Sequence, residues 1–152
     1  MRVRLFSVAI LALFAAAGCG GSKSASTTQT PSIQDEQGFA DGFVHRLVVV
    51  GRWGAVAGDV PPLQTRNVRS FQDTLRTDGV RKVIGHGALR HDCPATPAVG
   101  AGKDCFVYHL RGRQVVPTQG AVVLNSQFRL WLSYVDGHWQ FANYDYDLRP
   151  AG

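Results

Sequence analysis

Residues 130–145 read LWLSYVDGHWQFANYD, and they carry the strongest local structural signal in the chain. Asp136-Gly137 is a strong signal for a two-residue hairpin turn, because both turn positions need a positive φ. Before the turn, apolar and polar residues alternate from Ala121 to Val135, which predicts a half-buried strand. The strand that follows, from His138 to about Asp147, is therefore expected to pair antiparallel with it.

In the rest of the chain, the spacing between apolar residues changes once, from a helical to a strand-like pattern. From Gln34 to about Ala57, apolar residues recur mostly at three- and four-residue steps, which predicts a helix, and Thr65–Leu75 predicts a second. After this second helix the period becomes two, and strands are expected over Val80–Arg90 and Cys105–Val116. Two helices followed by four strands predict an α+β fold, with the helices packed on one face of a curved antiparallel sheet.

The hairpin over residues 130–145, together with the helix-helix-sheet order over Gln34 to Leu148, resembles the nuclear-transport-factor-2-like (SnoaL-like) superfamily. There, a long strand, an Asp-Gly type of turn and a Trp-x-Ile/Phe strand close a cone-shaped, cystatin-like domain. The resemblance implies a pocket between the helices and the concave face of the sheet. The chain departs from the pattern in its Cys-bracketed Pro/Gly loop between the first two strands, which the superfamily does not require.

The N-terminus has the organisation of an export signal. Arg2 and Arg4 precede an apolar run, Leu5–Ala17, which is shorter than the roughly 20 residues that a transmembrane helix needs. The residues 16–19, Ala-Ala-Gly-Cys, resemble the lipobox of bacterial lipoproteins, in which the cysteine is diacylated and becomes the new N-terminus. Ala16 stands where that pattern usually has Leu. The alternative is an ordinary secretory signal that is cleaved nearby, with Cys19 incidental.

The segment after Cys19 favours the lipoprotein interpretation. It consists mainly of Gly, Ser, Thr and Gln and cannot bury enough surface to fold, as expected of a tether between a lipid and a domain. We therefore expect a signal peptide over residues 1–18, a flexible tether over 19–33 and one domain over 34–150. The predicted location is extracytoplasmic, with the domain anchored to the cell membrane through the acylated Cys19.

Export also bears on the two remaining cysteines, Cys93 and Cys105, because disulfides persist outside the cytoplasm. They bracket a loop with two Pro and two Gly, so we expect them to form a disulfide. Two free thiols, or a metal site with His91 and His109, are the alternatives. The spacing lacks the short Cys-x-x-Cys step of structural zinc sites, and we expect no metal and no cofactor.

The charge distribution gives no support to nucleic-acid binding. The formal net charge is +5, but without the two arginines of the signal the chain has 14 basic and 11 acidic residues. This surplus is small and scattered, and no stripe of aromatic and basic residues accompanies it. The expected partners are membrane lipid and an envelope protein or small ligand, with a homodimer through the sheet as a further possibility.

Several residues are candidates for a site in the pocket that the resemblance implies. His45 on the first helix and Asp145 on the last strand are the candidate acid-base groups, since a carboxylate on an apolar face has a raised pKa. Asp145 is expected to share a face with Trp139 and Phe141. The expected ligand-pocket residues are Phe43, Leu47, Tyr134, Trp139 and Tyr144, and further candidates for chemistry are His86, His109 and Tyr146.

These candidates do not make a catalytic motif. The sequence contains no nucleophile elbow, no His-x-x-x-His helix and no glycine-rich phosphate loop before a helix. We therefore expect a domain that binds a small apolar ligand or an envelope partner without catalysis. The alternatives are an acid-base isomerase or dehydratase, and a structural dimerisation module. Trp131, opposite Leu130 and Leu132 in the strand alternation, is expected to be exposed and to mark a contact patch.

Overall fold

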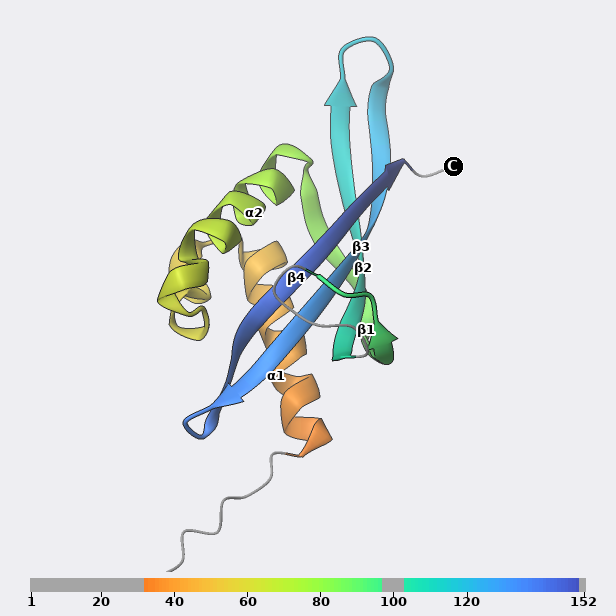
Figure 1. The fold of residues 1–152 in the computed structure, drawn as a ribbon. Helices are drawn as coiled ribbons and strands as arrows, with labels where there is room; N and C mark the ends of the chain where they lie inside the picture. Colours follow the sequence, from red (N-terminus) through yellow and green to blue (C-terminus); the bar gives the residue numbers. More distant parts are fainter. Residues whose placement is uncertain (1–31, 97–102, 151–152) are drawn as a thin grey trace, which may run out of the picture.

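The computed structural model describes residues 32–96 and 103–150, which form two helices and a four-stranded antiparallel sheet. The predicted α+β class is thereby confirmed (Figure 1). In chain order the principal elements are α1 (Ile33–His45), α2 (Thr65–Thr77), β1 (Val80–Cys93), β2 (Lys103–Val116), β3 (Gly120–Val135) and β4 (His138–Pro150). Among the described residues, no helix is long and apolar enough to span a membrane.

The first helix ends earlier than its apolar pattern predicts. Ser32 caps α1 by accepting a hydrogen bond from the backbone N–H of Asp35, and a π-helical turn, Arg46–Val50, continues it. The helix then stops at Gly51, which adopts a left-handed φ of 62°. Three short 3-10 turns between Trp53 and Gln64 carry the chain to α2. The expectation of one helix extending to Ala57 was wrong.

The sheet is a simple meander in the order β1-β2-β3-β4. Asp136 and Gly137 have φ values of 51° and 83°, which confirms the predicted turn between β3 and β4. Both β1 and β4 extend further than the sequence indicates, to Cys93 and Pro150. In Figure 1 the β2–β3 hairpin projects at one end of the molecule, whereas the β3–β4 turn and the start of α1 lie at the other.

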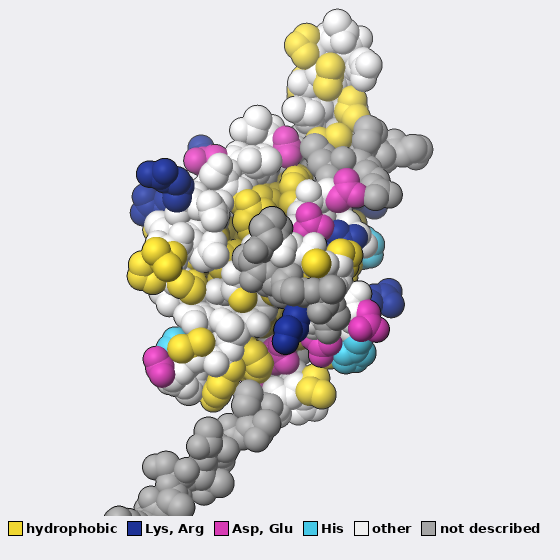
Figure 2. Space-filling view, viewed as in Figure 1, with side chains coloured by type: hydrophobic (Ala, Val, Ile, Leu, Met, Phe, Trp, Pro, Cys, Tyr) yellow, Lys and Arg dark blue, Asp and Glu magenta, His cyan; other side chains and the backbone are white. Residues whose placement is uncertain are grey.

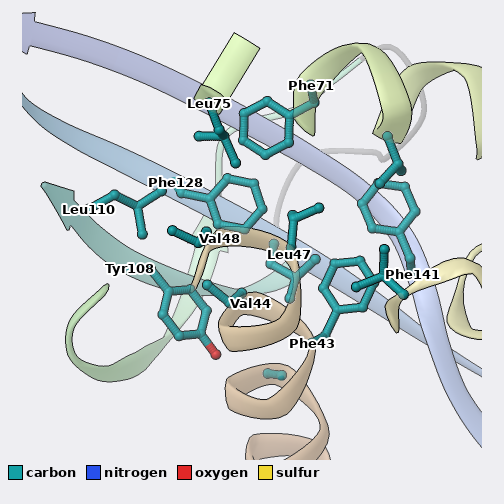
Figure 3. Close-up of a cluster of buried hydrophobic side chains, with 14 of the residues drawn as sticks. Phe43, Val44, Leu47, Val48, Phe71, Leu75, Tyr108, Leu110, Phe128 and Phe141 are labelled. Carbon is teal, nitrogen blue, oxygen red and sulfur yellow. The ribbon is translucent and has the colours of Figure 1, made fainter. Parts of the chain in front are cut away.

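The main core fills the space between the helices and the sheet. Phe71 of α2 stacks on Phe128 of β3, with ring centroids 5.2 Å apart, and Phe43 of α1 stacks on Phe141 of β4 at 5.7 Å. The rings and aliphatic side chains between them interdigitate (Figure 3). The largest fully buried side chains of this cluster are Phe43, Leu47, Leu75, Phe106, Tyr108, Leu110, Phe128, Leu130 and Phe141.

Two of the irregularities in the strand pairing affect the positions of candidate site residues. In β1, Ile84 pairs with His109 and Ala88 with Val107, so that Gly85, His86 and Gly87 bulge out opposite a single residue of β2. In β4, Leu132 pairs with Phe141 and Trp131 with Asn143, so that Ala142 is the extra residue. Every side chain of β4 beyond this point therefore points to the face opposite the one that its spacing from Phe141 indicates.

The face of the sheet away from the helices has a small core of its own. The predicted disulfide joins Cys93 to Cys105, and Val107, Trp131 and Ala142 pack against it. Trp131 is only 2% exposed, so the expectation of an exposed contact patch at this residue was wrong. The chain after Cys93 crosses towards β4, where the Asn143 side chain donates a hydrogen bond to Thr96 Oγ1 at 2.5 Å.

Candidate functional site

The space between the helices and the sheet, where the resemblance places a pocket, is filled by side chains. Phe43 and Leu47, two of the predicted pocket residues, are 0% and 1% exposed and belong to the main core. Protein interiors at this packing leave few voids larger than a water molecule. The hollows considered as ligand sites below lie at the edge of this core.

One of these hollows is a cleft between α2 and β4, which we call the α2–β4 cleft, with a volume of about 680 Å³. This lies within the range of roughly 300–1,000 Å³ that is usual for small-molecule sites. Its walls combine aromatic rings with amide and hydroxyl groups. The lining residues are Gln64, Asn67, Phe71 and Thr74 from α2 and the turn before it, Pro94–Thr96, and Asn143–Tyr146 of β4.

A stack of aromatic rings forms the apolar wall of this cleft. Tyr144 lies against Phe71 with ring centroids 4.3 Å apart, and Tyr146 meets the same Phe71 ring edge-on at 5.1 Å. Burial raises the pKa of Tyr144, so its phenol is neutral at physiological pH and can donate a hydrogen bond. The Tyr146 hydroxyl lies 3.5 Å from Asp78 Oδ2. The cleft thus offers an apolar face beside neutral hydrogen-bonding groups.

Asp145 is the one charged residue among the described residues that line the cleft, and it does not act there as an isolated carboxylate. The bulge at Ala142 puts it on the outer face, where Arg129 of β3 donates a hydrogen bond to its Oδ2. The Arg129 guanidinium also reaches the Gln127 side chain at 2.6 Å. The expectation that Asp145 shares a face with Phe141 was therefore wrong, because the extra residue lies between them.

A second site lies where α1 meets the bulge of β1, and its centre is Asp41. One oxygen of this carboxylate accepts hydrogen bonds from the Tyr108 hydroxyl at 2.8 Å, the Gly87 backbone N–H at 3.1 Å and the Gln37 amide at 3.0 Å. The other oxygen lies 3.1 Å from His86 Nδ1. We call these residues the Asp41 cluster.

The backbone at the bulge is what allows this cluster to form. A Cβ atom on Gly87 would lie 2.3 Å from Cζ of the Tyr108 ring, so only glycine lets β1 approach the phenol this closely. The bulge also turns His86 towards α1, although its side chain remains 90% exposed. Bulges often re-aim a side chain in this way beside functional sites.

The environment of the Asp41 cluster affects both of its acidic groups. Burial by itself raises the pKa of Asp41, but the hydrogen bonds from Gly87, Tyr108, His86 and Gln37 outweigh burial and hold the pKa below its usual value. Burial, and then the adjacent Asp41 carboxylate, raise the pKa of Tyr108 far above its usual value. At physiological pH the pair is therefore an ionised carboxylate and a neutral phenol that donates to it.

A hollow of about 370 Å³ opens beside the Asp41 cluster. His45, the candidate acid-base residue on α1, lines it together with His86, while Arg81 and Lys82 contribute the cationic side chains. The sequence therefore indicated two residues of this site, His45 and His86, but missed Asp41 and Tyr108. A buried tyrosine hydroxyl needs a partner, which was the one signal that pointed to a carboxylate near Tyr108.

The structure does not gather the other predicted site residues into one pocket. Tyr134 and Trp139 face each other near the tip of the β3–β4 hairpin, with their rings 5.0 Å apart and edge-on. Tyr144 is the one predicted pocket residue that lines the α2–β4 cleft. His45 and Asp145 line different hollows. Cys19, the predicted lipidation site, lies outside the described residues.

Among the described residues, no three His, Cys, Asp or Glu side chains converge in a geometry that could hold a metal ion. Comparison with known proteins adds no family assignment. No family model, no curated protein and no solved structure matches this chain. The function therefore has to be argued from the residues of the chain itself.

Proposed function

We propose that this chain is an exported lipoprotein, anchored through acylated Cys19, whose nuclear-transport-factor-2-like domain binds a small ligand at the outer surface of a membrane. The α2–β4 cleft is the binding site. The observation that carries this proposal is the composition of the cleft, in which the Phe71–Tyr144 stack adjoins the amides of Gln64, Asn67 and Asn143.

The chemistry of the cleft favours a neutral ligand that combines an apolar face with hydroxyl or amide groups. Aromatic rings bury such a face, and the amide groups of the cleft can donate and accept hydrogen bonds with its polar substituents. Acetamido sugars are ligands of this kind, and they occur outside the cytoplasm. The absence of a nucleophile with an adjacent base among the described residues that line the cleft fits binding rather than turnover.

Calorimetric titration with N,N′-diacetylchitobiose tests the cleft. We expect saturable binding that Asn67→Ala weakens by about tenfold, which corresponds to the loss of one hydrogen bond that a bound polar group needs. Arg76→Ala is the matched control, since Arg76 lies on the same helix and contacts Asp73 at the exposed surface. Equal affinities for the two variants, or no binding at all, contradict the proposed ligand class.

The anchor has a separate test. Mass spectrometry of the membrane-extracted protein should find a diacylated N-terminal cysteine at position 19, and Cys19→Ala should release the domain from the membrane fraction. A native product that is soluble and begins at Met1 contradicts the lipoprotein assignment. Homodimerisation through the sheet remains a prediction, which sedimentation velocity of the detergent-solubilised protein tests.

An acid-base activity is the second candidate, and the Asp41–His86 contact is the observation that favours it. A carboxylate on Nδ1 orients the imidazole and leaves Nε2 to face the hollow, as a general base requires. This candidate predicts that the chain accelerates exchange of the α-protons of a cyclic enone with deuterated solvent, and that His86→Gln abolishes the effect. Exchange at the rate of the buffer alone contradicts it.

A further inference from the structure

The β2–β3 hairpin continues well beyond the body of the sheet. The last pair between β1 and β2 is Val80 with Gly112, and β4 accompanies β3 only to the pair of Leu124 with Pro150. Residues 113–123 therefore form a two-stranded arm, beside which the described part of the chain places no further strand. Figure 1 shows this arm projecting from the end of the molecule. An isolated two-stranded arm is only marginally stable in water, so a surface that covers it has a stabilising role.

The arm is apolar and carries no charge beyond its first residue. Residues 114–124 read QVVPTQGAVVL, and within them Val115 is 75% exposed and Val123 is 44% exposed. The visible side of the tip in Figure 2 has hydrophobic and uncharged side chains only. Exposed apolar groups gathered in this way are typical of contact surfaces. The turn itself is tight, with the Gln119 backbone N–H bonded to the Val116 carbonyl at 3.0 Å.

The base of the arm is basic. Arg111 and Arg113 of β2 are exposed there, and the register places Lys82 of β1 opposite Arg111. From Cys105 to Val135 the chain contains no Asp or Glu. The backbone carbonyl of Asp78, in the α2–β1 turn, lies near Gly112, and its carboxylate lies 3.5 Å from the Tyr146 hydroxyl. The apolar tip of the arm matches the acyl-chain layer of an anionic bilayer, and its basic base matches the negatively charged headgroup layer.

We propose that residues 113–123 are a membrane-contact arm, whose valines enter the headgroup boundary of an anionic bilayer while Arg111 and Arg113 contact lipid phosphates. Insertion is shallow, because the open backbone edges of a two-stranded arm cannot lose their hydrogen-bond partners in the hydrocarbon core. The proposal uses the anchor of the proposed function only to bring the domain near a bilayer, and it does not involve the α2–β4 cleft.

The length of chain before α1 is compatible with this orientation. Thirteen residues, Gly20 to Ser32, lie between Cys19 and the start of α1. Extended, they can span up to about 45 Å. The sixteen residues of β3, which run from the arm to the opposite end of the molecule, span about 50 Å. A domain tethered at Cys19 can therefore tilt towards the bilayer, so that the tip of the arm enters deeper than its base.

The depth of a tryptophan probe tests the arm. Val115→Trp is introduced into the full chain, the protein is reconstituted into vesicles of phosphatidylcholine and phosphatidylglycerol in excess, and quenching by lipids brominated near the headgroup is measured after subtraction of the wild-type emission. We expect roughly twofold quenching of the added fluorescence, because the probe lies at the headgroup boundary. Arg111→Gln with Arg113→Gln should reduce this quenching, and so should raised salt.

Tyr134→Trp is the matched control, since Tyr134 is also exposed and lies beside the β3–β4 turn, where it pairs with Trp139. Quenching at 115 well above that at 134 supports the proposal. Quenching at 134 alone, or at neither position, overturns it. A lipid-independent blue shift at 115 that grows with protein concentration also overturns it, because a second copy of the chain then covers the arm. Flotation of the vesicles reports the acyl anchor separately, so failure of one assignment is distinguishable from failure of the other.

Discussion

The two faces of the sheet are held together by different means. On the inner face, helices α1 and α2 cover a stack of aromatic and aliphatic side chains that are almost fully buried. On the outer face, a disulfide and three side chains, Val107, Trp131 and Ala142, form the whole packed cluster among the described residues. The inner face is therefore stabilised by buried apolar area, and the outer face by a covalent cross-link. The sheet therefore depends on the outer face far more under oxidising than under reducing conditions.

A substitution in the core of the inner face should give the largest loss of unfolding free energy. Phe128 is fully buried and its ring contacts Phe71, Tyr108 and Tyr144. Phe128→Ala leaves a cavity that these rings cannot fill, so we expect the free energy of unfolding to fall by about 3–5 kcal/mol. Urea denaturation followed by circular dichroism measures it. Val123→Ala on the same strand is the control, since Val123 is partly exposed. If both variants lose similar amounts of unfolding free energy, the inner face is not packed more tightly than the β2–β3 arm.

On the outer face, removal of the disulfide should give the second-largest loss of unfolding free energy. Cys93 and Cys105 are twelve residues apart, and a disulfide that closes a loop of this size contributes about 3 kcal/mol on the chain-entropy model. We expect Cys93→Ala with Cys105→Ala to lower the unfolding free energy by this amount in oxidising buffer. With a thiol reductant present, the variant and the wild type should unfold at nearly the same urea concentration. A difference that persists after reduction would assign the stabilisation to packing instead.

The order of elements could be predicted from the sequence because local patterns determine it. The alternation from Ala121 to Val135 and the Asp136-Gly137 turn each depend on neighbouring residues, and both were predicted correctly. The end of the first helix was not, since its apolar pattern continues past Gly51, where the backbone turns left-handed. A single glycine in an apolar run can lie within a helix or end it, and the sequence contains nothing that decides between the two.

The site was harder to predict than the fold, because it depends on the two bulges. A one-residue slip moves every later side chain to the other face, and the extra residue Ala142 does this to Asp145. Trp131 does lie opposite Leu130 and Leu132, but it is buried against the disulfide, a contact that strand alternation does not indicate. The bulge at Gly85–Gly87 likewise brings His86 to Asp41, 45 residues away in the chain. Gly85 and Gly87 are a local signal for the β1 bulge, because glycine within a strand often marks a bulge, whereas nothing in the local sequence marks the extra residue Ala142. The position of a carboxylate on a strand therefore could not be read from alternation alone.

The Asp41 cluster joins the inner face to the edge strand β1. Its substitution should cost less unfolding free energy than loss of the disulfide and more than loss of the His91–Asp104 pair. Asp41→Asn leaves the buried Tyr108 hydroxyl and the Gly87 N–H with a weaker, neutral acceptor, so we expect a loss of about 2 kcal/mol at pH 7. The pKa of Asp41 is lower in the folded than in the unfolded protein, so its stabilisation is present above the unfolded pKa and is lost as pH falls through the folded pKa.

Because the pKa of Asp41 is lowered in the folded protein, the Asp41 cluster can be tested by the loss of stability at acidic pH. Between pH 5 and pH 2, to be covered by urea titrations, the wild type should lose more stability than Asp41→Asn, and the two should converge at the acidic end. Tyr108→Phe removes one of the four donors and should give a smaller loss with the same pH trend. If the gap between wild type and Asp41→Asn stays constant down to pH 2, the carboxylate is not what the cluster stabilises.

The smallest effect belongs to the outer face, at the ion pair that adjoins the disulfide. His91 Nδ1 lies 2.9 Å from Asp104 Oδ1, and the hydrogen bond with Asp104, followed by the charge of Asp104, raises the pKa of His91 above its usual value. Because the folded pKa is the higher one, the contribution of the pair to stability is fully present below the unfolded pKa and is lost as pH rises through the folded pKa.

An NMR titration of the His91 ring measures this pKa directly. Asp104→Asn should lower it towards the unperturbed value, whereas Asp92→Asn should lower it less, because the Asp92 charge acts without a hydrogen bond and is the smallest of the causes. An equal shift in the two variants would mean that only the overall negative charge near the disulfide matters. A larger shift for Asp104→Asn would show that the outer face, though it lacks an extensive core, still orients its polar side chains specifically around the cross-link.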